Sequence, residues 1–124
     1  MIERMDNVGI VVDDLASAIA FFVDLGLELE GEATVEGPLV DRLVGLEGVR
    51  SDVAMLRTPD GHGRIELSKF HAPTAVSLEP NPPVNRLGMG RIMFAVDDID
   101  AVVAFLRSLS GEGYADRPPR SFPQ

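Results

Sequence analysis

The stretch Asn7-Val8-Gly9-Ile10-Val11-Val12-Asp13-Asp14-Leu15 decides the fold, because a stretch of the same kind returns 84 positions later. The second copy is Arg91-Ile92-Met93-Phe94-Ala95-Val96-Asp97-Asp98-Ile99. Each copy is an apolar run that ends in two aspartates. A repeat at this long spacing indicates two copies of one structural module, and a site between two such modules is the first place to look for a function.

Each apolar run predicts a strand, and the segment after each aspartate pair predicts an amphipathic helix. The apolar residues of one helical face are Leu15, Ala18, Ile19, Phe22 and Leu25 in the first copy, and Ile99, Val102, Val103, Leu106 and Leu109 in the second. The paired aspartates are best explained as helix caps, because a carboxylate accepts the exposed amide protons of a first helical turn.

The segment after the first helix predicts three further strands, over residues 27–35, 51–57 and 64–70, with a turn at 58–63 and a short helical turn near 40–44. Residues 1–72 therefore form a first β-α-β-β-β module. Residues 73–88 are a proline-rich linker, and residues 89–110 start a second module with a strand and a helix. The repeat stops after Ser110, and residues 111–124 form an irregular tail, which is native, truncated or the product of a frame shift.

Composition narrows the function classes. The net charge of −9 and the lack of a basic stripe argue against nucleic acid or an acidic membrane as a partner. There are no cysteines, so disulfides, thiolate metal sites and a cysteine nucleophile are excluded. No secretion signal or membrane-spanning run is recognisable, which predicts a cytoplasmic protein.

Several of these stretches resemble the vicinal oxygen chelate superfamily, which includes glyoxalase I, bleomycin-resistance proteins, extradiol dioxygenases and an epimerase. The resemblance rests on Val8–Leu15, Leu25–Leu27, Pro59–Leu67 and Phe94–Ile99, which occur in the family's order. It implies an α+β fold in which paired βαβββ modules curl into a cup, here with the second module incomplete.

The resemblance also implies where a metal would bind. The family often holds a divalent metal with a histidine on the first strand and a glutamate on the last strand of each module. These positions fall on Asn7, Glu66 and Arg91, and the fourth has no counterpart that we identify. Asparagine is a poor ligand for a transition metal, and a guanidinium repels a cation. We therefore expect no cofactor; if Mn, Fe, Ni, Zn or Mg does bind, Glu66 is its predicted ligand.

Strand alternation would place Asn7, Glu66, Arg91 and Met93 on the face that lines the cup. Met93 and Met55 are candidates to line an adaptable pocket, although core filling is the usual role of methionine. Glu66 is either a ligand or base, or the ion-pair partner of Arg91. Arg91 would otherwise bind an anion through two hydrogen bonds.

Two functions stay open. The first is a superfamily member that binds a small organic molecule, anionic if Arg91 takes part, in a cup whose usual metal site is degraded. The alternative is a metal-dependent lyase, epimerase or dioxygenase, with Glu66 as the catalytic residue, that uses a non-standard ligand set or a site completed by a second chain. Both predict a homodimer, because an unfinished module leaves a strand edge and an apolar cup exposed.

Overall fold

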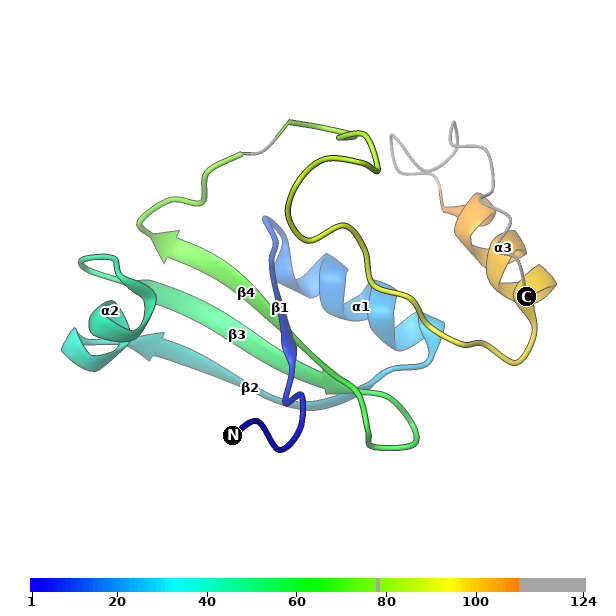
Figure 1. Cartoon of the computed structure of the whole chain (residues 1–124), viewed down its shortest axis with the longest axis horizontal. Helices are drawn as coiled ribbons and strands as arrows, with labels where there is room; N and C mark the ends of the chain where they lie inside the picture. The colour runs from blue at the N-terminus through cyan, green and yellow to red at the C-terminus, as the bar shows by residue number, and fades with distance from the viewer. Residues whose placement is uncertain (78, 110–124) are drawn as a thin grey trace. The chain divides into compact units, whose positions relative to one another are not determined.

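The computed structural model describes residues 1–77 and 79–109, and the chain divides into two compact units, 1–79 and 80–124 (Figure 1). The division lies inside the segment predicted to be a linker. The exact domain boundaries expected from the sequence stay predictions.

The first unit contains a four-stranded mixed sheet. Its elements are β1 (Val8–Val11), α1 (Leu15–Leu25), β2 (Glu28–Glu36), α2 (Pro38–Val44), β3 (Arg50–Arg57) and β4 (Arg64–Ala72). The strands lie in the order β1-β4-β3-β2; β1 is parallel to β4, and the other neighbours are antiparallel. This confirms the α+β class and the predicted element order of the first module, with α2 inserted before β3.

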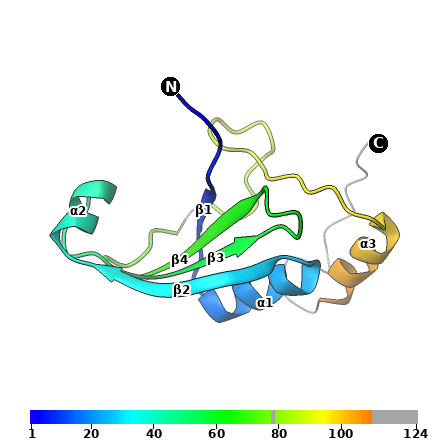
Figure 2. The same cartoon turned by 90° about the horizontal axis from the view of Figure 1, so that it is seen from below.

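Helix α1 covers one face of this sheet, and the core lies between them (Figure 2). Leu56 of β3 and Leu67 of β4 are fully buried. The helix residues packed against the core are Leu15, Ala18, Ile19 and Phe22. The spacing of apolar residues along the sequence therefore identified the face of α1 that packs on the sheet. These side chains are partly buried, so each contributes less than the about 1.5–3 kcal/mol of a fully buried large side chain.

Both ends of α1 are capped as the sequence suggests. The Asp14 side chain accepts a hydrogen bond from the Ser17 backbone N–H at 3.0 Å, which satisfies a free donor of the first turn. Gly26 ends the helix in the left-handed conformation, with φ of 116°. A residue with a Cβ is strained there, so glycine gives the turn into β2 at low cost.

Strand β2 contains a bulge at Glu30. Leu29 is opposite Leu56 and Gly31 is opposite Met55, so Glu30 has no residue opposite it in β3. The chain then enters α2, which lies at one end of the sheet on the side opposite α1 (Figure 2). Apart from α2 at that end, no helix of the first unit covers this face of the sheet.

The second unit contains α3 (Ile99–Ser108), whose first turn is capped by Asp98. The helix confirms the sequence prediction, but the strand predicted over Arg91–Val96 is not formed in the part of the chain that the structure describes. A strand is stable only when a neighbour pairs with its backbone, and this segment has none there. The predicted tail lies outside the described residues. None of the helices in the described ranges is long and apolar enough to cross a membrane.

Candidate functional site

The uncovered face of the sheet carries a row of four residues that runs across all the strands. Gly9 of β1 is opposite Glu66 of β4, Glu66 is opposite Met55 of β3, and Met55 is opposite Gly31 of β2. A Cβ atom built on Gly9 or on Gly31 would meet nothing within 4 Å. The row therefore holds a carboxylate and a thioether between two positions without side chains.

Glu66 is half-buried and makes few contacts within the described residues. Its Oε1 accepts one long hydrogen bond, 3.5 Å, from the Ser68 hydroxyl, and no ion pair with a described residue involves it. A carboxylate has about four acceptor positions, so the described residues leave most of the acceptor capacity of Glu66 unused. Its sheet neighbours Gly9 and Met55 bring no competing donor. This arrangement suits a ligand that donates a hydrogen bond.

The same face continues in both directions from this row. Toward one end Val11, Ser68, Val53 and Ala33 form the next row, which is mainly apolar. Toward the other end Arg64 and Arg57 are directly opposite each other. The face thus combines an apolar part with a charged end, and Glu66 lies between them.

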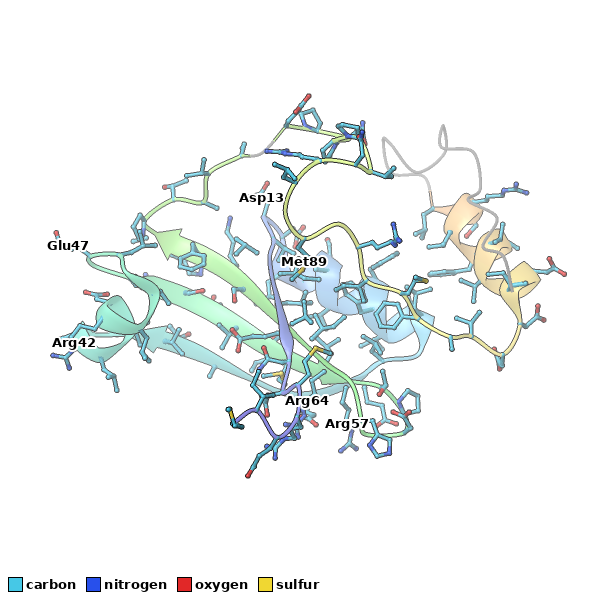
Figure 3. The ribbon with its side chains drawn as sticks, in the orientation of Figure 1. Asp13, Arg42, Glu47, Arg57, Arg64 and Met89 are labelled. Carbon is cyan, nitrogen blue, oxygen red and sulfur yellow. The ribbon has the colours of Figure 1, made fainter. Side chains whose placement is uncertain are left out.

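The charged end is neutralised by carboxylates. The Arg64 Nε lies 3.2 Å from Glu30, and the Arg57 Nε lies 2.9 Å from Glu28. Longer contacts of 3.9 Å join Arg57 to Glu30 and Arg64 to Asp6. Glu30 therefore lies between two guanidinium groups that would repel each other (Figure 3 labels both arginines). Because both arginines are already paired, this end has little free positive charge with which to hold an anion.

Asn7 lies just before β1, where its carboxamide already has a partner. Its Nδ2 donates a 2.9 Å hydrogen bond to Asp6. That bond helps to lower the pKa of the Asp6 carboxyl, together with the hydrogen bond from Arg4. Asn7 thus belongs to the charged end of the face.

Of the five candidate residues predicted from the sequence, Asn7, Met55 and Glu66 lie in the first unit, and Met55 and Glu66 are direct neighbours across the sheet. Arg91 and Met93 lie in the second unit and are exposed. The alternation argument that assigned them to the cup does not apply, because no strand forms there. Their part in a site stays a prediction, as does the Glu66–Arg91 pair.

Comparison with known proteins agrees with this geometry. A model of the glyoxalase/bleomycin resistance protein/dioxygenase superfamily matches residues 4–121. The chain belongs to that superfamily. The crystal structure of a glyoxalase family protein from Bacillus cereus is 50% identical in sequence, with a TM-score of 0.81, and the match covers 86% of this chain and 71% of that one. A comparison with curated proteins returned no match.

Membership of the glyoxalase superfamily makes the metal-ligand positions worth testing against the structure. At the three positions that the resemblance implies, the side chains are the amide of Asn7, the carboxylate of Glu66 and the guanidinium of Arg91, which cannot coordinate a metal. Among the described residues, no three histidine, cysteine, aspartate or glutamate side chains gather where they could hold a metal ion. These residues do not fit the metal site that the family resemblance implies, since only Glu66 is an ordinary ligand.

The two histidines lie away from the Glu66 row. His62 is in the β3–β4 turn, as predicted. His71 is 2.7 Å from Asp52, whose other oxygen accepts a 2.6 Å hydrogen bond from Thr34. These bonds, the one from Thr34 foremost, lower the pKa of Asp52. Strand alternation places Asp52 on the same face as Ala54 and Leu56, which is the face that α1 covers.

Sequence reasoning missed Gly31 and Arg57. Gly31 could be found only once the β2–β3 register is known, because the bulge at Glu30 shifts every later pair by one residue. Arg57 could have been predicted from the sequence, because strand alternation places it on the same face as Met55, two residues earlier.

Proposed function

We propose that this glyoxalase-superfamily protein binds a small organic molecule on the uncovered face of the sheet, with Glu66 as the hydrogen-bond acceptor at the centre of its site. The observation that carries the proposal is the row Gly9–Glu66–Met55–Gly31. The carboxylate of Glu66 is half-buried and forms no ion pair within the described part of the chain. Its neighbours in the row are open space at the glycines and one adaptable apolar side chain, that of Met55.

The proposed ligand has an apolar body and at least one hydrogen-bond donor. The apolar body suits Met55 together with Val53 and Val11, which form part of the next row on the same face. The donor suits the free oxygens of Glu66. Asn7, Arg91 and Met93 are further proposed contacts, and an anionic group on the ligand would be the partner of Arg91.

The first experiment tests the floor of the site with two model ligands, benzoate and its neutral amide benzamide. Benzamide has the donor that Glu66 requires, so we expect its addition to shift the backbone NMR signals of Gly9, Met55 and Gly31 in the intact chain. Benzoate lacks the donor, and its binding would depend on Arg91. Ligands of this size are expected to bind with dissociation constants in the millimolar range. Absence of shifts with both compounds at about 10 mM would therefore contradict the proposal.

Two variants locate the ligand. Glu66→Gln keeps the shape and removes the charged acceptor, and we expect benzamide binding to weaken about tenfold. Gly9→Val fills the space beside Glu66 and should abolish binding while the strand still forms, because valine favours strands. The matched controls are Glu32→Gln, which strand alternation places on the other face, and Ala20→Val, at an exposed position of α1. Equal losses in the controls would contradict the assigned position.

A metal-dependent lyase, epimerase or dioxygenase is the second candidate, and the free acceptor capacity of Glu66 is the observation that favours it. Such an enzyme would need ligands other than the family's usual set, or a ligand from a second chain. Elemental analysis of the purified protein separates the two candidates. Mn, Fe, Ni, Zn or Mg at one per chain, lost in Glu66→Gln but kept in Glu32→Gln, would support the enzyme and contradict the metal-free binder.

A further inference from the structure

An apolar surface on and after α2 is the clearest feature of the first unit that the ligand site does not use. Four large side chains form it, and we name it the α2 surface. Their exposed fractions are 62% for Leu39, 76% for Leu43, 49% for Val44 and 45% for Leu46. A group of exposed large apolar side chains within one short segment is typical of a contact site.

The α2 surface is held in a fixed shape. Leu39 and Leu43 are four residues apart, so they lie on one side of the helix. Gly45 ends the helix in the left-handed conformation, and the Leu46 backbone N–H returns to the Asp41 carbonyl at 3.2 Å. The Asp41 carboxylate accepts hydrogen bonds from the backbone of Gly48 and Val49, at 3.0 and 2.8 Å. A fixed surface loses little entropy when a partner binds.

The charges beside the α2 surface are self-complementary. Arg42 lies within the helix and Glu47 follows Leu46, and both are exposed. Figure 3 shows the two side chains on different sides of α2. Within the described residues neither forms an ion pair. In a contact with two-fold symmetry, each copy presents the same patch, so Arg42 of one chain can meet Glu47 of the other at two equivalent places.

The edge strands of the sheet, β2 and β1, are poorer contacts for a second copy. Strand β2 carries Glu28, Glu30, Glu32 and Glu36, which would face the same charges of another β2. Strand β1 has four residues, which gives few backbone hydrogen bonds.

We propose that the α2 surface is a self-association site, where two chains pack Leu39, Leu43, Val44 and Leu46 against each other across a two-fold axis and pair Arg42 with Glu47. This assignment does not depend on the ligand of the Glu66 row. Four side chains cover less than the roughly 800 Å² per partner of a standard interface, so the dimer is weak, with a dissociation constant on the order of 100 µM.

Sedimentation equilibrium of the full chain between about 10 and 500 µM tests the apolar part of the site. We expect a monomer–dimer equilibrium that Leu43→Glu weakens at least tenfold. The control is Val76→Glu, which puts the same charge at an exposed valine outside the α2 surface. A monomer throughout this range would overturn the proposal, and so would a dimer that Leu43→Glu leaves unchanged. Circular dichroism of each variant confirms that the fold is kept.

A charge exchange tests the geometry independently. Arg42→Glu alone and Glu47→Arg alone each place like charges together, and we expect each to weaken the dimer three- to tenfold. The double variant restores the opposite charges and should recover most of the affinity. No recovery would show that the two residues do not meet across the axis and would overturn the symmetric arrangement. Neither residue belongs to the Glu66 row, so failure here leaves the ligand-binding proposal untouched.

Discussion

The two copies of the repeated stretch start from nearly the same sequence pattern and reach different structures. In the first, Val8–Val11 forms a strand and Asp14 caps α1. In the second, Asp98 caps α3 with almost the same backbone geometry, but residues 91–96 form no strand. The N-cap ψ angles are 97° and 98°, and the capping bonds are 3.0 and 3.1 Å. The two copies therefore agree in the helix, whose hydrogen bonds are local in sequence, and differ in the strand, whose hydrogen bonds are not.

The difference follows from where each element finds its hydrogen bonds. A helix satisfies its backbone groups within itself, so the aspartate and the apolar face suffice to specify it. A strand needs a neighbour far away in the sequence, and β1 has β4, with Ile10 opposite Leu67. The described part of the second unit offers residues 91–96 no such neighbour. The following predictions test this contrast, beginning with the largest expected effect.

Truncation of the buried side chain opposite Ile10 of β1 should have the largest effect. Leu67 is fully buried between β1, β3 and α1. We expect Leu67→Ala to lower the free energy of unfolding by about 3 kcal/mol, because the cavity adds to the lost burial. Urea denaturation followed by circular dichroism measures it. The control Leu87→Ala removes an exposed leucine and should change the free energy by less than about 0.5 kcal/mol.

The equivalent positions Ile10 and Phe94 compare the copies directly. Ile10 packs against the core, whereas Phe94 is partly exposed and lies in no strand. We expect Ile10→Ala to cost about 1–2 kcal/mol of unfolding free energy and Phe94→Ala less than about 0.5 kcal/mol, although phenylalanine is larger. Equal losses in urea denaturation would mean that the second copy has a packed strand after all.

The caps should respond alike in the two copies. Asp14→Ala and Asp98→Ala each remove a side chain that accepts the backbone N–H three residues later, so each helix should lose about 1 kcal/mol. Hydrogen exchange at the amides of 17–25 and 101–108 reads each helix separately. Asp13→Ala and Asp97→Ala are the neighbouring controls, and exchange that speeds up equally in them would rule out the assigned caps.

The smallest effect concerns pH. Hydrogen bonds from the Ser17 backbone and hydroxyl lower the pKa of Asp14. A lowered pKa in the folded state means that the cap stabilises α1 above the unfolded value of about 3.9 and loses this contribution as the pH falls through the folded value. We expect Ser17→Ala to raise the Asp14 pKa toward its ordinary value, as measured by carboxyl NMR titration. A pKa that stays unchanged would mean that the hydroxyl contributes nothing.

Local signals in the sequence were sufficient for the helices and for the order of elements in the first unit. The aspartates, Gly26 and the spaced apolar residues determined α1, and the proline and glycine turns separated the strands. The sequence also predicted Glu66 and Met55 as site residues; the sheet register makes them neighbours, and their part in a site stays a prediction. The strand at 91–96 was wrong because an apolar run shows only that a segment could pair, while pairing requires a second segment.

The remaining parts of the candidate site depend on long-range register. Gly9 and Gly31 matter because they are in line with Glu66, and nothing near either glycine in the sequence shows this. The same holds for Glu30, whose role depends on two arginines 27 and 34 positions away. For Arg91 and Met93, the argument from strand alternation does not apply, because residues 91–96 form no strand.

The bulge at Glu30 has a consequence for how this chain can change by insertion and deletion. The pairs on either side, Leu29 with Leu56 and Gly31 with Met55, would be consecutive in a regular ladder if residue 30 were absent. Loss of that one codon would therefore leave every side chain of β2 on its present face. It would remove only the acid between Arg57 and Arg64. We therefore expect relatives that lack a residue at position 30 to have replaced one of the two arginines as well.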